Sequence, residues 1–177
     1  MVKEYVLVTG GLGFIGSHTC IELLQSNQNV LVLDNLSNSK IEVKEKMETI
    51  TNKNIIFHKV DLLNQEDIEC IFHDYKISSV IHFAGLKSVN ESTKKPMKYY
   101  QTNLISTMNL IEVMEKYECF HLIFSSSCTV YGSETVIVKE ETPTGKNIVN
   151  PYGRTKYMIE EILKDLYASN PKWNISI

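Results

Sequence analysis

Short apolar runs alternate with longer segments of helical periodicity along most of the chain. The runs are apolar at almost every position, as in residues 5–8 and 30–33. Strands of this kind are buried on both faces of a sheet. Alternating strand and helix patterns are typical of βαβ units, whose strands form a parallel sheet. The pattern therefore predicts an α/β fold built on a doubly wound parallel sheet.

The same periods give the expected elements. We expect strands at about residues 5–9, 29–33, 54–60, 79–83 and 120–126. We expect helices at about residues 14–26, 39–50, 65–75, 96–116 and 151–168. One more strand pattern begins at Trp173 and runs to Ile177, and we interpret it as a central strand. Residues 1–177 then form one domain, which we expect to be a fragment of a longer protein.

Composition narrows the class of protein. With 177 residues, 43% of them hydrophobic, the chain can bury one sizeable core without a disulfide or a metal ion. The formal net charge is -3 and no basic tract is present, so we expect no nucleic-acid partner. No apolar run approaches the roughly 18 residues needed to cross a bilayer. The first strand pattern starts too early to leave room for a leader peptide.

The four cysteines form no recognisable motif. Cys20, Cys70, Cys119 and Cys128 are scattered, with no Cys-x-x-Cys pair and no histidine at metal-ligand spacing. We interpret them as reduced, buried thiols. We therefore expect a cytoplasmic protein without a metal site.

Three glycines follow the first strand and open the first helix. Gly10, Gly13 and Gly16 stand in the spacing Gly-x-x-Gly-x-x-Gly. Glycine here allows a tight turn, a close approach of the backbone to a pyrophosphate, and packing of the helix on the sheet. The helix N-terminus, at Phe14 and Ile15, offers free N–H groups and a partial positive charge to phosphates. We predict a Rossmann-type domain with these five residues in a dinucleotide site.

Asp34 ends the second predicted strand. A carboxylate there can accept hydrogen bonds from both ribose hydroxyls of an adenosine. Its charge repels the 2′-phosphate of NADP, and residues 35–39 contain no arginine to compensate. We therefore predict NAD as the cofactor and assign Asn35, Asn38 and Ser39 to its site. The alternative is that Asp34 only caps a strand.

Asp61 and Leu62 follow the third predicted strand. At that place they would lie beside the adenine, and Asp61 would accept a hydrogen bond from its exocyclic amine. The alternative is an ordinary turn, in which aspartate is common.

A tyrosine and a lysine on one helix predict the catalytic centre. Asn150 is a good N-cap and Pro151 a good first helical residue, which places Tyr152 in the first turn. Lys156 follows four residues later and shares the face of Tyr152. Ser127, after the fifth predicted strand, can hydrogen-bond the same substrate hydroxyl. We predict Ser127, Tyr152 and Lys156 as the catalytic residues.

The chemistry of this set depends on charge. A phenol is a poor base at neutral pH unless its anion is stabilised. The Lys156 ammonium, the helix N-terminus and an oxidised nicotinamide each favour the phenolate of Tyr152. Lys156 can also reach the nicotinamide ribose. On its own, a Tyr–Lys pair four residues apart is a common surface pair, so the prediction depends on the serine cluster and the glycine loop.

These motifs resemble those of a known family. The glycine loop together with Tyr152-x-x-x-Lys156 resembles the extended short-chain dehydrogenase/reductase family, over the whole chain. The resemblance is greatest to the members that epimerise sugar nucleotides. It is carried by residues 34–39, 82–87, 95–96, 99–100 and 125–132.

The resemblance implies residue roles that spacing alone does not give. The resemblance implies further contacts with the cofactor from Phe83, Ala84, Gly85, Lys87, Asn103, Tyr152 and Lys156. The implied substrate contacts are Lys87, Ser127, Thr129 and Tyr152, with Tyr152 as the acid/base. Without the resemblance, Lys87 would be interpreted as a solvated loop residue.

The implied reaction is the interconversion of UDP-glucose and UDP-galactose, a step of galactose metabolism. Tyr152 takes the proton of the sugar 4-hydroxyl while carbon 4 gives a hydride to NAD. The 4-keto sugar then presents its other face and takes the hydride back, so NAD stays bound and is not consumed. The family's second half supplies most of the sugar and uridine pocket. We therefore expect residues 1–177 alone to be inactive.

The alternative functions are a dehydratase, an epimerase of other sugars and a noncatalytic NAD-binding module. A sugar-nucleotide 4,6-dehydratase needs an extra acid where this sequence has Cys128 and Thr129, and the family's epimerases usually have alanine in place of Cys128. Epimerases of N-acetylated or pentose sugars stay open, because the residues that set pocket size lie beyond Ile177. A noncatalytic NAD-binding module would not need an activated Tyr152.

The family also pairs through two helices. Residues 96–116 and 151–168 carry broad apolar faces, which predict a homodimer. The same apolar residues are equally suited to the core.

Overall fold

The computed structural model describes residues 3–133 and 137–177, which contain one six-stranded sheet. All neighbouring strands are parallel, in the order β3-β2-β1-β4-β5-β6. The strands are β1 (Glu4–Thr9), β2 (Val30–Asp34), β3 (Ile56–Lys59), β4 (Lys76–His82), β5 (His121–Phe124) and β6 (Asn174–Ser176). The order reverses between β1 and β4, the kind of place where doubly wound sheets bind ligands. The predicted fold class is confirmed.

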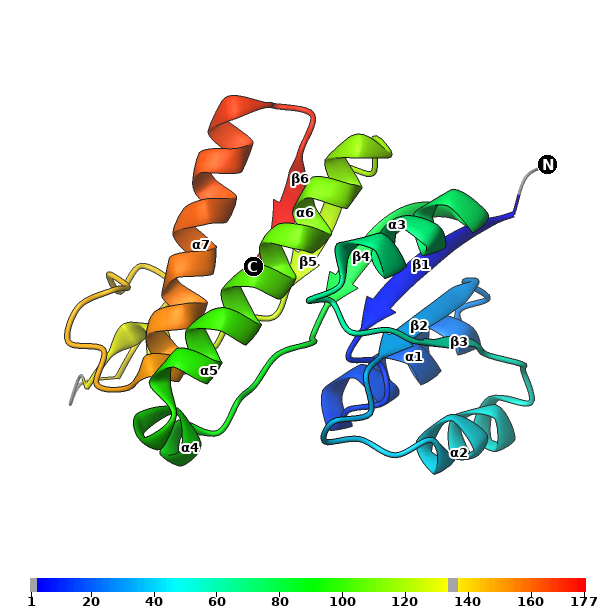
Figure 1. The fold of residues 1–177 in the computed structure, drawn as a ribbon, viewed down its shortest axis with the longest axis horizontal. Helices are drawn as coiled ribbons and strands as arrows, with labels where there is room; N and C mark the ends of the chain where they lie inside the picture. Colours follow the sequence, from blue (N-terminus) through cyan, green and yellow to red (C-terminus); the bar gives the residue numbers. More distant parts are fainter. Residues whose placement is uncertain (1–2, 134–136) are drawn as a thin grey trace.

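Helices cover both faces of the sheet. They are α1 (Phe14–Gln25), α2 (Glu42–Thr51), α3 (Gln65–Asp74), α4 (Val89–Lys94), α5 (Pro96–Tyr100), the π-helical turn η1 (Gln101–Ile105), α6 (Ser106–Lys116), the 3-10 helix η2 (Cys128–Tyr131) and α7 (Pro151–Ser169). α1 and α2 lie on one face, and α3, α6 and α7 on the other (Figure 1). Among the described residues, no helix is both long and apolar enough to cross a membrane.

β1 and β2 are apolar over most of their length because each contributes to two cores. In β1, Leu7 packs with residues of α3, α6 and α7, while Val8 packs with residues of α1 and α2. In β2, Leu31 and Val32 divide in the same way. Side chains alternate between the faces of a strand, so a sheet covered on both faces needs apolar residues at every position.

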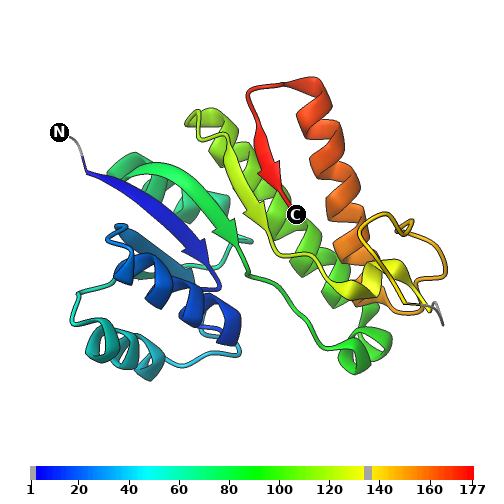
Figure 2. The same ribbon diagram turned by 180° about the vertical axis from the view of Figure 1, so that it is seen from behind.

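On the face that carries α1 and α2, no helix of the described residues covers β5 and β6 (Figure 2). Leu122 and Phe124 of β5 are each 2% exposed against the helices of the other face, whereas Ile123 between them is 49% exposed. Figure 2 shows β5 and β6 from this side, with no helix in front of them. β6 pairs with β5 at the edge of the described sheet. The sequence predicts a central strand at residues 173–177, whereas β6 is an edge strand in the described part of the chain.

Several element boundaries differ from the prediction. α2 begins at Glu42 instead of residue 39, because the Ser39 hydroxyl donates to the Asp34 carboxylate at 2.7 Å and holds the preceding segment in a loop. α4 was not predicted. It is a single short helix that begins where the Ser88 hydroxyl accepts the Glu91 N–H at 3.2 Å. The predicted helix at 96–116 is present but is interrupted by the π-helical turn η1.

The prediction of buried cysteines is half wrong. Cys20 and Cys119 are buried, and burial raises the pKa of their thiols to about 12 and about 11 respectively. Cys70 and Cys128 are exposed, on α3 and at the start of η2. Both exposed thiols lie on the solvent side of short elements that bury other residues. All four cysteines are free.

Candidate active site

A cavity of about 770 Å³ opens at the carboxyl ends of the strands, across the point where the strand order reverses. Its volume is typical of a small-molecule site. Eighteen of the predicted site residues line it: Gly10, Gly13, Phe14, Ile15, Gly16, Asp34, Asn35, Asn38, Ser39, Asp61, Leu62, Phe83, Ala84, Gly85, Lys87, Ser127, Tyr152 and Lys156. The fold therefore brings the glycine loop, the Asp34 segment and the Tyr–Lys helix to one cavity.

Close backbone packing explains the glycines. Gly10 has a φ of 67°, and a Cβ there would lie 2.7 Å from the backbone N of Ala84 at the end of β4. A Cβ on Gly16 would collide with the carbonyl oxygen of Gly10. Gly13 is the N-cap of α1. Because it has no side chain, it forms no capping hydrogen bond with the first N–H groups of the helix. The first N–H groups of α1 are left for an anion, as the sequence predicts.

Asp34 ties together the loops at its end of the cavity. Its side chain is buried, and Oδ2 accepts the N–H of Leu12 at 3.1 Å. Oδ1 accepts the N–H of Leu36 at 3.0 Å and the hydroxyl of Ser39 at 2.7 Å. An ionised carboxylate has about four acceptor positions. Asp34 thus ties two loops together and retains acceptor capacity for a ribose hydroxyl.

Asp61 lies on the same wall of the cavity and is exposed. Its Oδ1 accepts the N–H of Leu63 at 3.0 Å, and its Oδ2 accepts the side-chain amide of Asn35 at 3.1 Å. Both interpretations of Asp61 therefore have support, because it forms a turn and also faces the cavity.

The first turn of α7 is built as predicted. The Asn150 side chain accepts the N–H of Gly153 at 2.8 Å, and Pro151 is the first residue of the helix. Tyr152 is half-buried in the wall of the cavity. The cap and the proline fix the start of the helix, and so they fix which residue faces the cavity.

Lys156 is a buried cation. Its side chain donates to the carbonyl oxygen of Ser125 at 2.7 Å and lies 4.5 Å from the centre of the Phe124 ring. Burial lowers the pKa of the Lys156 ammonium to about 8. The side chain is therefore mostly charged at neutral pH, and it places a positive charge in the same cavity wall as Tyr152.

The Ser127 hydroxyl is oriented by Thr129. Ser127 Oγ accepts the backbone N–H of Thr129 at 3.3 Å and its hydroxyl at 3.0 Å. With its acceptor positions filled, Ser127 is free to donate its own proton toward the cavity. Thr129 itself lies outside the cavity lining, although the resemblance implies that it touches the sugar. A Cβ on Gly153 would lie 3.0 Å from the Thr129 hydroxyl, so the start of α7 packs directly on Thr129.

Asn103 also lies behind the cavity wall, although it was predicted to contact the cofactor. Its side chain is 2% exposed. The amide accepts the N–H of Leu86 at 2.8 Å and donates to the carbonyl oxygen of Leu86 and the Thr155 hydroxyl, both at 3.0 Å. Asn103 therefore holds residues 85–88, which we call the Lys87 loop, against η1 and α7.

Sequence reasoning missed a second contact between α7 and the serine cluster. The Ser126 hydroxyl donates to the carboxylate of Glu160, which is 6% exposed. Glu160 follows Lys156 by one helical turn, and Lys156 binds the carbonyl of Ser125. A glutamate four positions after Lys156, on the same face of the helix, is the sequence signal that could have revealed it.

Buried His82 was also missed. Its ring nitrogens lie 2.7 Å from the Thr9 hydroxyl and 3.0 Å from the Thr107 hydroxyl. Burial, and secondly the nearby Lys156 charge, lowers its pKa to about 3. His82 is thus neutral and joins β1, β4 and α6 beneath the cavity. Further lining residues that were not predicted are Leu12, Leu33, Ser37, Lys40, Val43, Val60, Leu86, Thr102, Ser106, Ser125 and Ser126.

Comparison with known proteins agrees with this geometry. The profile of the NAD dependent epimerase/dehydratase family matches residues 6–177, which is nearly the whole chain. The chain belongs to this family. The family name specifies NAD, in agreement with the predicted cofactor.

Relatives of this epimerase/dehydratase chain include UDP-glucose 4-epimerases. Those of Bacillus subtilis and Dictyostelium discoideum are each 49% identical to it, over 97% and 98% of this chain and 50% of their own length. The structure of UDP-glucose 4-epimerase from Bifidobacterium longum, a complex with NAD+ and UDP, matches with a TM-score of 0.94 at 46% identity. That match covers 97% of this chain and 51% of the other. The chain thus spans about half the length of these relatives.

We expect this epimerase/dehydratase chain to bind NAD at least about tenfold more tightly than NADP, because a 2′-phosphate would meet the Asp34 carboxylate. Calorimetric titration with each dinucleotide measures the ratio. Asp34→Asn should reduce this ratio of NAD to NADP affinity. Asp61→Asn, which alters another carboxylate in the cavity, should leave it unchanged. Equal affinities in the unmodified protein would show that Asp34 does not select the cofactor.

Proposed function

We propose that the protein to which this chain belongs interconverts UDP-glucose and UDP-galactose by NAD-dependent epimerisation at carbon 4. The observation that carries this proposal is the presence of Ser127, Tyr152 and Lys156 in the wall of the same cavity as the glycine loop and Asp34. The relatives named above are UDP-glucose 4-epimerases, which supports this reaction within the family. The role would lie in galactose metabolism.

The residues present fit NAD. The backbone packing at Gly10 and Gly16 leaves no room for a side chain at either position, which keeps the loop tight beside the cavity. Asp34 would hold the adenosine ribose, with Asp61 and Leu62 beside the adenine. Phe83, Ala84, Gly85 and Lys87 would line the central part of the cofactor, and Lys156 would reach the nicotinamide ribose. Bound there, NAD supplies a hydride acceptor that can return the hydride to either face of the sugar.

The chain's own residues supply proton transfer. Tyr152, as phenolate, takes the proton of the sugar 4-hydroxyl, and later returns it to the 4-oxygen. The Lys156 ammonium favours the phenolate by its charge. Ser127, whose oxygen already accepts two hydrogen bonds from Thr129, donates to the sugar 4-oxygen. Lys87, which also lines the cavity, supplies a cation for the anionic part of the ligands.

We further propose that residues 1–177 are an NAD-binding domain and that the rest of the sugar and uridine pocket lies outside them. The support is that the relatives are about twice as long, and that Ile123 is 49% exposed where no described helix covers β5 (Figure 2).

We therefore expect negligible turnover from residues 1–177 expressed alone. A coupled assay with UDP-galactose measures it, and NAD binding by the same preparation is the control for folding. Conversion of UDP-galactose at an ordinary enzymatic rate would show that the pocket is complete without further residues.

The proposal includes a homodimer and a cytoplasmic location. A homodimer through α5, α6 and α7 is supported by exposed apolar side chains on these helices and on η1 between them, at Met97, Ile105, Met108 and Met158. A cytoplasmic location is supported by the four free cysteines, because reducing compartments maintain thiols.

A further inference from the structure

The Lys87 loop carries a cation into the cavity without being part of a helix or strand. It joins β4 to α4, and Gly85, Leu86 and Lys87 all line the cavity. Lys87 itself is exposed. A lysine side chain on an unsupported loop would sample many positions, because its rotamer entropy is large. The structure holds this loop at two points, one on each side of Lys87.

Asn103 supplies the first point of attachment. It binds both the N–H and the carbonyl oxygen of Leu86, at 2.8 and 3.0 Å. This pairing copies the two hydrogen bonds that a neighbouring strand would make, so the residue before Lys87 is fixed in position and direction.

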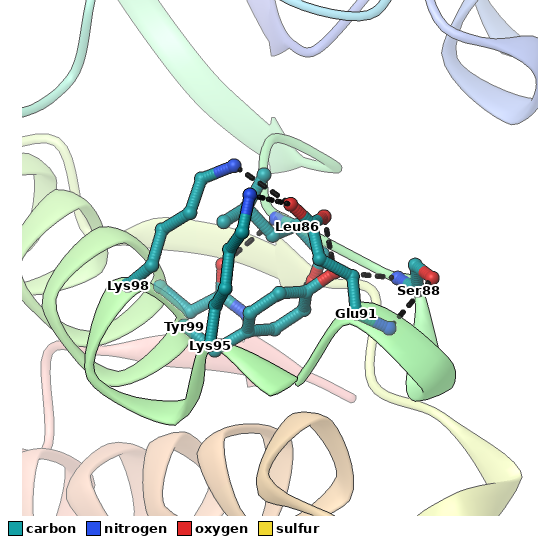
Figure 3. Close-up of polar contacts among 7 residues, drawn as sticks. Leu86, Ser88, Glu91, Lys95, Lys98 and Tyr99 are labelled. Atoms are coloured by element: carbon teal, nitrogen blue, oxygen red, sulfur yellow. Dashed lines mark hydrogen bonds and ion pairs between the residues drawn. The ribbon is translucent and has the colours of Figure 1, made fainter. Parts of the chain in front are cut away.

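Tyr99 supplies the second point of attachment. Its side chain is 0% exposed, and its hydroxyl oxygen accepts the backbone N–H of Ser88 at 3.0 Å (Figure 3). The same hydroxyl donates to Oε2 of Glu91 at 3.1 Å. Because the proton is committed to Glu91, the lone pairs of the oxygen face the Ser88 N–H. Tyr99 thus holds the residue that follows Lys87.

Glu91 fixes the direction of the Tyr99 hydroxyl. Its other oxygen, Oε1, pairs with Lys98 at 3.0 Å and Lys95 at 3.8 Å, and Figure 3 shows both lysine side chains directed at this carboxylate. The hydrogen bond from Lys98, and secondly that from Tyr99, lowers the pKa of the Glu91 carboxyl. Glu91 therefore stays ionised and remains an acceptor for Tyr99 at neutral pH.

We propose that Tyr99 is a positioning residue for Lys87: together with Asn103, its hydroxyl clamps the Lys87 loop so that the lysine is presented to the bound dinucleotide. The inference rests on the proposed function, since it assumes that Lys87 contacts NAD. Tyr99 touches neither cofactor nor substrate, and it acts only through the loop.

The test compares NAD affinity in the protein and in Tyr99→Phe, Lys87→Met and the double variant. Tyr99→Phe keeps the buried ring and removes only the oxygen. We expect it to weaken NAD binding by about 2- to 10-fold, the effect of one lost hydrogen bond. In the Lys87→Met background the same change should have no further effect, because the group that it positions is gone. Tyr100→Phe, on the adjacent half-buried phenol of α5, is the matched control and should leave NAD affinity unchanged.

The outcomes separate the alternatives. A general packing role for the Tyr99 hydroxyl would weaken NAD binding by the same factor in both backgrounds, and that result would overturn the proposal. So would Tyr99→Phe with unchanged NAD affinity. If Lys87→Met alone leaves NAD affinity unchanged, Lys87 is not the positioned group and the proposal also fails. If the unmodified protein binds no NAD, the proposed function itself is wrong, and this inference falls with it.

Discussion

Changing Tyr152 to Phe is expected to lower epimerase turnover by ~10²–10⁴-fold, the usual effect of losing a positioned acid/base. The change removes the one oxygen that Tyr152 offers to a substrate proton and keeps the ring that helps to line the cavity. NAD should therefore remain bound, and the melting temperature should hardly change. The measurement is turnover of UDP-galactose by the full-length protein, with NAD content determined on the same sample.

Tyr157 provides the matched control for this prediction, because it lies on the same helix and does not line the cavity. Tyr157→Phe should retain turnover. If Tyr152→Phe retains near-normal turnover with NAD bound, another group moves the proton, and the mechanism given above is wrong. If turnover, NAD content and melting temperature fall together, Tyr152 is needed for folding more than for chemistry.

Lys156→Met is expected to abolish most turnover at neutral pH and yet to make the protein more stable. Turnover falls because the cavity that Tyr152 lines loses the buried Lys156 charge, so activity should rise only at higher pH than in the unmodified protein. Stability rises because a buried ammonium is removed. A pKa lowered from 10.5 to about 8 corresponds to about 3 kcal/mol. The lost hydrogen bond from the charged Lys156 to the Ser125 carbonyl offsets about 2 kcal/mol of this, leaving a gain of about 1 kcal/mol.

The stability gained by Lys156→Met should decrease as the pH rises. Below about pH 8 the lysine is charged in both the folded and the unfolded chain, so the full penalty of burying the charge is present. Between about pH 8 and 10.5 the folded protein has released this proton and the unfolded chain has not, so the stability of the unmodified protein rises with pH. The advantage of Lys156→Met should therefore shrink across that range.

Urea unfolding of both proteins at pH 7 and pH 10, without added NAD, measures this difference. Lys164→Met is a control, because Lys164 lies exposed on the same helix and pairs with Glu161 at 2.6 Å. It should give little change at either pH, since exposed ion pairs contribute little. A Lys156→Met protein that is less stable at pH 7 would show that the hydrogen bond and the contact with the Phe124 ring outweigh the cost of burial.

Much of the site could be predicted because its signals are local in the sequence. The glycine spacing, the carboxylate at the end of β2 and the N-cap before Tyr152 each reflect a backbone requirement that only a few residue types meet. The strands could be predicted because residues such as Leu7 and Val8 supply two cores at once. The order of the strands places these separate motifs at one cavity.

The residues that could not be predicted act across longer distances. Nothing near Asn103 in the sequence shows that its amide binds Leu86 and Thr155, which are 17 and 52 positions away. Glu160 is buried where it contacts Ser126, which is 34 positions away. The roles of such residues depend on tertiary packing, which propensity and periodicity do not describe.

The π-helical turn η1 changes the direction in which the side chains after it point. A π turn includes one residue more than an α turn, so every later side chain is set back by about 100° around the axis. Before and within the turn, Tyr99 and Asn103 grip the Lys87 loop. After it, Leu110, Val113 and Met114 of α6 enter the core against the sheet. A regular α-helix through the same positions would put one of these two sets out of phase with its partner. The extra residue therefore acts as a phase shift between the binding surface and the core, and it makes this stretch intolerant of a single insertion or deletion.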